Sequence, residues 1–169
     1  LTKTQRQIFS LLWSQVSNLC QGSYRSTYGV CTTAMVGAKG IGKTTTLKIF
    51  NATAKYAFAN IIAIYISMNN ILMSGSLMKL NSIMEIVAMK LKVMGIEVSD
   101  ESTLLSLNIL TTLKGKGLFL HLCVDELDQA YKVDGSKYEA VVRSLNDLAY
   151  LGDQPTGRVA VVVCGSSAL

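Results

Sequence analysis

Charged residues are scarce in this sequence. Of its 169 residues only 16% are charged, against about 25% in an average globular protein, and 50% are hydrophobic. This composition excludes a disordered tail, because disordered segments are polar and highly charged. It indicates instead helices and strands that are buried on both faces. The net charge of +5 allows an anionic partner but is too small to argue for a nucleic-acid binder.

The sequence also lacks the residue spacings of disulfide and zinc sites. Its four cysteines form no C-x-x-C pair, and three of them fall inside apolar runs, where cysteine behaves as a small hydrophobic residue. We therefore expect reduced thiols in an intracellular protein, cytoplasmic or nuclear. His121 is the only histidine, and it lies in the middle of an apolar run of strand length, away from the end where a ligand would bind. We therefore expect His121 to be a core residue and assemble no Ser/His/Asp triad.

Long apolar segments are missing as well. No apolar run approaches the roughly 18 residues that indicate a membrane-spanning helix, so we predict no membrane partner. The N-terminus carries neither a signal peptide nor a starting methionine, and the chain ends directly after an apolar strand. We expect both ends to have been cut from a longer protein.

The hydrophobic pattern divides the chain into two parts. Residues 1–28 are interpreted as an N-terminal helix, over 5–19, and a linker, over 21–28. Residues 29–169 are interpreted as one core domain in which strands alternate with helices. The strands are continuous apolar runs, which is typical of a parallel sheet covered on both faces. The predicted strands are 29–36, 61–67, 118–124 and 159–164; the predicted helices cover 47–58, 77–94, 101–114 and 138–148.

The strongest motif joins the first core strand to the following helix. Residues 37–44 match G-x-x-x-x-G-K-[ST] at every fixed position, which chance would produce in about 1% of chains of this length. The glycines let backbone N–H groups surround phosphate oxygens, and the helix start adds its positive end. Lys43 should reach the β- and γ-phosphates, and Thr44 should bind Mg²⁺. The predicted nucleotide-binding residues are Gly37, Ala38, Lys39, Gly40, Ile41, Gly42, Lys43, Thr44 and Thr45.

A second motif, over 118–126, is an apolar strand that ends in two carboxylates. The carboxyl end of a parallel strand faces the ligand crevice of an open α/β sheet. Asp125 can hold Mg²⁺ there, since a hard cation prefers oxygen ligands. Glu126 can orient and deprotonate an attacking water, and Asp128 is a rival for this role as a base.

Through these two motifs the chain resembles the P-loop NTPases, with Walker A at 37–44 and Walker B at 118–126. Glu126 directly after Asp125 is similar to the AAA+ and STAND branch. The stretch 164–167, Cys-Gly-Ser-Ser, is similar to the sensor-1 position and to archaeal-ATPase-like STAND proteins, which implies that Ser166 or Ser167 contacts the γ-phosphate or the attacking water. More distantly, the motifs are similar to the NTPase modules of Crinkler-type and retrotransposon-hot-spot-type proteins.

The resemblance implies a fold and an activity. The fold is a three-layer α/β/α P-loop NTPase with a mostly parallel sheet, truncated after the fourth core strand, so that a fifth strand, a second sensor and a lid domain are missing. The strand at 159–164 should lie between the two motif strands. The implied cofactors are ATP and Mg²⁺, and the chain could act with further copies or with the remainder of a longer chain.

Three functions remain open at this stage. The first is an ATPase that couples hydrolysis to a conformational change, and the second is an ATP-binding switch or scaffold with little turnover. The third is a nucleic-acid remodelling module, which the net charge of +5 permits but no basic or stacking motif supports. A GTPase is disfavoured because no N-K-x-D or D-x-x-G motif is present. A small-molecule kinase stays open as a weaker alternative, since it would not need Glu126 in this position.

Overall fold

The computed structural model describes residues 1–21, 32–37, 41–69, 83–129 and 135–166. The predicted linker at 21–28 lies outside this part of the chain, except for its first residue. The elements that position the site are the helices α1 (Lys3–Gln21), α2 (Lys43–Ala57), α5 (Ile83–Val93), α6 (Leu105–Lys116) and α8 (Gly135–Ala149), and the strands β1 (Thr32–Gly37), β2 (Ile61–Ser67), β3 (Phe119–Asp125), β4 (Tyr150–Leu151), β5 (Gln154–Pro155) and β6 (Val159–Ser166).

Four of these strands form one parallel sheet in the order β1-β6-β3-β2. Valine and isoleucine dominate β2 and β6, as expected for strands that are covered on both faces. The prediction that the strand at 159–164 lies between the two motif strands is confirmed. Because all four strands run in the same direction, their carboxyl ends meet at one edge of the sheet.

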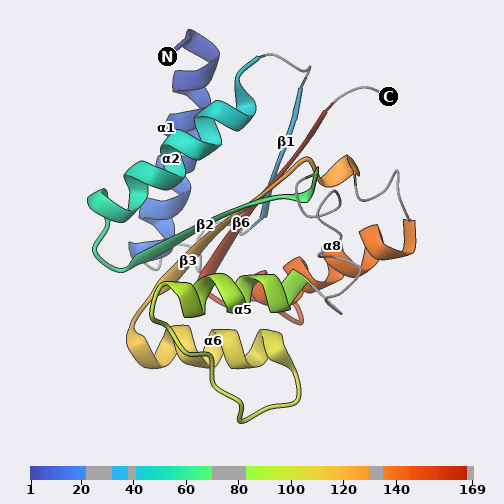
Figure 1. Cartoon of the computed structure of the whole chain (residues 1–169). Helices are drawn as coiled ribbons and strands as arrows, with labels where there is room; N and C mark the ends of the chain where they lie inside the picture. The colour runs from blue at the N-terminus through green and yellow to red at the C-terminus, as the bar shows by residue number, and fades with distance from the viewer. Residues whose placement is uncertain (22–31, 38–40, 70–82, 130–134, 167–169) are drawn as a thin grey trace.

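Helices cover both faces of this sheet, so the predicted three-layer α/β/α architecture is confirmed. Figure 1 shows α1 and α2 on one face and α5, α6 and α8 on the other. The hydrophobic core extends through both interfaces: α2 buries Leu47 and Phe50, β3 buries Leu120 and Leu122, and α8 buries Leu148. No described helix combines the length and the apolar character needed to cross a membrane.

The helix predicted over 101–114 begins later than expected, at Leu105, and ends at Lys116. Ser99 and Asp100 do not cap it, because the N-cap position is Leu104; the Ser99 backbone N–H instead donates to the Thr112 hydroxyl at 2.8 Å. The Asn108 side chain holds the same loop by accepting from the Ser102 N–H at 2.9 Å. These polar groups of α6 therefore stabilise an irregular loop where the sequence predicts a first helical turn.

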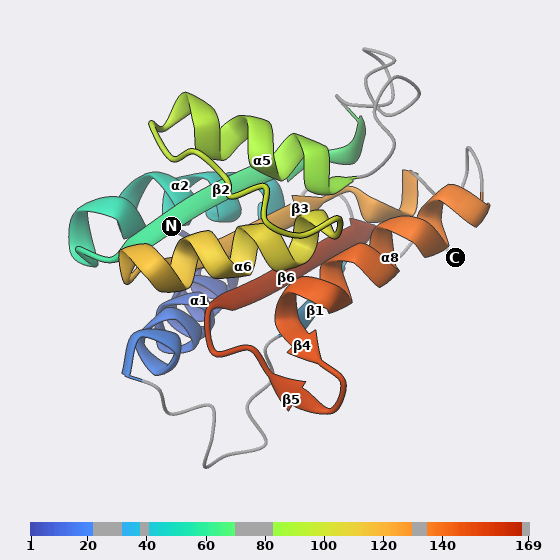
Figure 2. The same ribbon diagram turned by 90° about the horizontal axis from the view of Figure 1, so that it is seen from below.

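A short hairpin between α8 and β6 was not predicted. Tyr150 pairs with Pro155 and Leu151 with Gln154, across a turn in which Gly152 has a φ of 60°. Figure 2 shows the hairpin following directly on the end of α8. The predicted helix over 77–94 is described only as α5, and its earlier positions fall outside the described residues.

Candidate nucleotide-binding site

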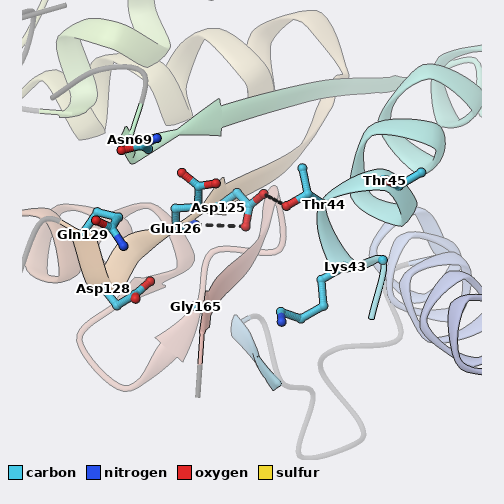
Figure 3. A pocket seen from close by; sticks show the side chains of 10 residues that line it. Lys43, Thr44, Thr45, Asn69, Asp125, Glu126, Asp128, Gln129 and Gly165 are labelled. Atoms are coloured by element: carbon cyan, nitrogen blue, oxygen red, sulfur yellow. Dashed lines mark hydrogen bonds between the residues drawn. The ribbon is translucent and has the colours of Figure 1, made fainter. Parts of the chain in front are cut away.

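A cavity of about 350 Å³ lies at the edge where the carboxyl ends of the parallel strands meet. It is bounded by the start of α2, the end of β6 and the residues that follow β2 and β3 (Figure 3). The sequence predicts a ligand at this edge, and both predicted motifs contribute to the lining. The lining residues are Gly42, Lys43, Thr44, Thr45, Asn69, Asp125, Glu126, Asp128, Gln129 and Gly165.

The described part of the phosphate loop leads directly into α2. Gly42 precedes the first helical residue with a φ of 87°, in the left-handed region that favours glycine. A Cβ at this position would also collide with the Gln5 side chain of α1. No side chain caps the helix, and Lys43 extends from its first turn into the cavity (Figure 3). Residues 38–40 of the motif lie outside the described residues.

The Asp125 carboxylate joins the two motifs. Its Oδ2 accepts a hydrogen bond from the Thr44 hydroxyl at 2.6 Å and another from the Tyr65 hydroxyl at 2.6 Å. Its Oδ1 accepts from the Glu126 backbone N–H at 2.9 Å. Asp125 is only 2% exposed, so these donors compensate for the water that the buried carboxylate has lost.

Glu126 has an unusual backbone. It is the only non-glycine residue with a positive φ among those described, at 58°. Such a conformation carries a steric cost that the surrounding structure must offset, and it is often found at functional sites. The hydrogen bond from its N–H to Asp125 helps to offset that cost. The Ser67 hydroxyl donates to Glu126 Oε2 at 3.3 Å, so the carboxylate is held from the neighbouring strand.

Asp128, the rival candidate for the base, also lines the cavity. It lies on a helical turn, 127–129, that follows Glu126 directly. Its carboxylate lies against Gly165 at the end of β6, where a Cβ would approach Asp128 Oδ1 to 3.2 Å. Geometry therefore brings both carboxylates to one cavity and does not by itself assign the base.

The predicted sensor residue, Ser166, is the last residue of β6. Its backbone pairs with Gly37 at the start of the phosphate loop, next to the cavity. Its side chain falls outside the described atoms, and so does the whole of Ser167. The contact of either hydroxyl with a phosphate or a water remains a prediction.

Five residues that line the cavity or contact residues that line it were not predicted as site residues: Tyr65, Ser67, Asn69, Gln129 and Gln5. Ser67 could have been found by the reasoning used for Asp125, because it ends a predicted parallel strand and pairs with Asp125 in the sheet. No sequence pattern indicated a role for Tyr65 at the site, because an aromatic residue in an apolar strand is expected in the core.

Two groups that contact Asp125, the Tyr65 hydroxyl and the Cys164 thiol, are held in their neutral forms. The pKa of the Tyr65 hydroxyl is raised by burial, and further by the hydrogen bond to Asp125 and the charges of Asp125 and Glu126. The pKa of the Cys164 thiol is raised to about 12 by burial, and further by the charge of Asp125 and a hydrogen bond with it. Both groups therefore keep their protons at neutral pH and remain available as donors.

His121 is a core residue, as predicted. It is 0% exposed, its ring packs against that of Phe50 in a tilted arrangement with 5.0 Å between centroids, and its Nε2 lies 3.4 Å from Gln15 Oε1. Burial lowers its pKa to about 4, because the low-dielectric interior disfavours the charged form. His121 is therefore neutral at neutral pH.

Comparisons with known proteins support the fold. No protein-family model and no curated protein sequence matches the chain. Among solved structures, the chain is similar to the Aeropyrum pernix ORC2 protein in its ADPNP–ADP complexes, with a TM-score of 0.60 and 14% identity over 98% of this chain and 42% of that one. The ADP form of ORC2 gives a TM-score of 0.57 and 18% identity over 95% of this chain and 40% of that one.

A third similar structure is Caenorhabditis elegans PCH-2, with a TM-score of 0.53 and 11% identity over 99% of this chain and 39% of that one. At these identities the similarity concerns the fold alone. The chain therefore shares the three-layer α/β/α fold of these proteins, and it spans about two fifths of the length of the solved structures it matches.

Proposed function

We propose that this chain binds ATP with Mg²⁺ and hydrolyses it, and that it belongs with the AAA+ and STAND ATPases. The observation that carries the proposal is the 2.6 Å hydrogen bond from Thr44 to Asp125. It joins the end of one motif to the end of the other, 81 residues apart in sequence, inside a cavity that also contains Lys43 and Glu126. That ORC2 structures contain ADP or ADPNP is consistent with a nucleotide at this edge of the fold.

The residues present fit both a nucleotide and a divalent cation. The left-handed Gly42 and the uncapped start of α2 suit phosphate oxygens, and Lys43 can neutralise them. Gly37 to Thr45 would surround the phosphates. The donor set for the cation is the Thr44 hydroxyl oxygen and the Asp125 carboxylate, which is the all-oxygen chemistry that Mg²⁺ prefers. Mg²⁺ bound there would neutralise charge on the β- and γ-phosphates.

Glu126 is our candidate for the general base. Its carboxylate lies on the cavity wall, while its backbone is fixed by Asp125 and its side chain by Ser67. A carboxylate held in this way is already oriented to bind a water molecule and to accept its proton. Lys43 would stabilise negative charge on the transferring phosphoryl group, and Ser166 is our candidate for a contact with that group or with the water.

The test separates binding from chemistry. Glu126→Gln keeps the shape and a hydrogen-bonding oxygen but cannot accept a proton, so single-turnover hydrolysis should fall about a hundredfold or more while ATP affinity stays the same or rises. Asp128→Asn is the matched control and should hydrolyse normally. If Asp128→Asn loses hydrolysis and Glu126→Gln does not, Asp128 is the base. If the parent protein binds ATP with Mg²⁺ but never hydrolyses it, the chain is an ATP-dependent switch and not an ATPase.

A further inference from the structure

Two hydroxyl groups donate to the same oxygen of Asp125, and only one of them belongs to the recognised motifs. Thr44 approaches Oδ2 from the start of α2, and Tyr65 approaches the same oxygen from β2, each at 2.6 Å. Tyr65 reaches Asp125 because β2 and β3 are paired, with Tyr65 beside Cys123 and Ser67 beside Asp125. The tyrosine hydroxyl therefore extends along the sheet by two residue pairs to meet the carboxylate.

Tyr65 itself stands behind the cavity wall. Asp125 and Thr44 line the cavity, whereas Tyr65 does not. The Tyr65 ring is half-buried, and the Lys48 ammonium of α2 lies 5.6 Å from its centroid. Tyr65 can therefore act on a ligand in the cavity only through Asp125, as a positioning residue.

Under the proposed function, the two hydroxyl groups that donate to Asp125 Oδ2 have different roles. The Thr44 oxygen is the group assigned to the cation, while the Tyr65 hydroxyl has no described acceptor other than Asp125. Groups that hold a metal ligand in orientation commonly change metal affinity by about 10- to 100-fold when they are removed. Because Asp125 is buried, losing one of its donors also leaves the carboxylate without a partner on that side.

We propose that the Tyr65 hydroxyl is the group that fixes the Asp125 carboxylate for binding Mg²⁺ in the nucleotide complex. The inference rests on the proposed function, because it needs a cation at Thr44 and Asp125. It goes further by assigning the orientation of the acidic motif to a residue of β2, outside both motifs, that neither lines the cavity nor contacts the phosphates.

Tyr65→Phe isolates the hydroxyl, since the ring and its packing against α2 are retained. Affinity for a fluorescent ATP analogue is measured over a range of Mg²⁺ concentrations and again in EDTA. We expect the Mg²⁺ concentration for half-maximal binding to rise about tenfold, with unchanged affinity in EDTA. Tyr56→Phe is the matched control, because Tyr56 is 83% exposed on α2, and it should behave as the parent does.

The outcomes distinguish this inference from the proposed function. If the parent binds the analogue no better with Mg²⁺ than in EDTA, no cation acts at Asp125, and both proposals are wrong. If the parent depends on Mg²⁺ and Tyr65→Phe responds to Mg²⁺ as the parent does, only the inference is wrong. An equal loss of affinity for Tyr65→Phe with Mg²⁺ and in EDTA also overturns it, because the hydroxyl would then support the general structure. Thermal melting of each variant checks that it is folded.

Discussion

The two faces of the central sheet differ in chemistry although the same strands form both. Side chains alternate between faces along a strand, so His121, Cys123 and Asp125 of β3 face α1 and α2, whereas Leu120 and Leu122 face α5, α6 and α8. The first face carries hydrogen bonds that reach Gln15, Thr44 and Tyr65 on three other elements. The second face is aliphatic.

This difference separates stability from function within a single strand. The aliphatic face gains its free energy from burial, which is non-directional and tolerates small shifts. The polar face depends on donors and acceptors at fixed distances, and each buried polar atom there needs its partner. We therefore expect substitutions on the aliphatic face to change the free energy of unfolding, and substitutions at the cavity on the polar face to change ligand binding.

The largest effect on stability should come from Leu122→Ala. Leu122 is 0% exposed on the aliphatic face, and removing a buried leucine side chain costs about 2–5 kcal/mol of unfolding free energy. Urea unfolding measures this loss, and Val93→Ala, at a position that is 88% exposed on α5, should change the value by less than about 0.5 kcal/mol. If folded Leu122→Ala bound ATP more weakly than the parent at a temperature where both are native, the separation of the two faces would fail.

The neighbouring residue, His121, should make stability depend on pH. Its pKa is about 4 in the folded protein and about 6.5 when unfolded, so the unfolded chain binds the proton more readily. The stabilisation is fully present above about pH 6.5 and is lost as pH falls towards 4, amounting to about 3 kcal/mol over that range.

Urea unfolding at several pH values between 7 and 4 measures the slope. His121→Gln removes the titrating group and should flatten it, while Leu122→Ala should lower stability at every pH and keep the slope. Equal slopes for the parent and His121→Gln would show that the buried imidazole does not control acid stability.

A smaller free-energy change than those of Leu122 and His121 is expected for Lys43→Ala at the cavity. Removing the cation expected at the phosphates should weaken binding of ATP with Mg²⁺ at least tenfold, or about 1.4 kcal/mol, with little change in the melting temperature. Lys55→Ala removes the same charge from the last turn of the same helix and is the matched control. An unchanged dissociation constant for Lys43→Ala would mean that the phosphate loop does not bind the nucleotide.

Local patterns made most of the fold predictable. The positions of β2, β3 and β6 agree with the predicted strands to within two residues, because continuous apolar runs of that length are favourable only when both faces are covered. The start of α6 and the hairpin after α8 were missed. In both places hydrogen bonds between a side chain and backbone six to eight residues away, those of Asn108 and Thr156, hold the backbone in a conformation that hydrophobic periodicity does not indicate.

The candidate site was predictable to the extent that its residues follow one another in sequence. Lys43 and Thr44 belong to one loop, and Asp125 and Glu126 end one strand, so their spacing alone indicates phosphate and metal chemistry. Tyr65 and Ser67 were not predictable from spacing, because each meets its carboxylate only through the pairing of two strands about 60 residues apart.

The sequence by itself determined the alternation of strands and helices, the phosphate loop and the acidic strand end. Each of these depends on local chemistry: backbone freedom at glycine, apolar runs and the order of charged residues. Only the tertiary structure decided that Glu126 adopts a positive φ and that Tyr65 and Thr44 share one oxygen of Asp125. Strand order and register set these contacts, and both follow from packing the whole sheet between its two helical layers.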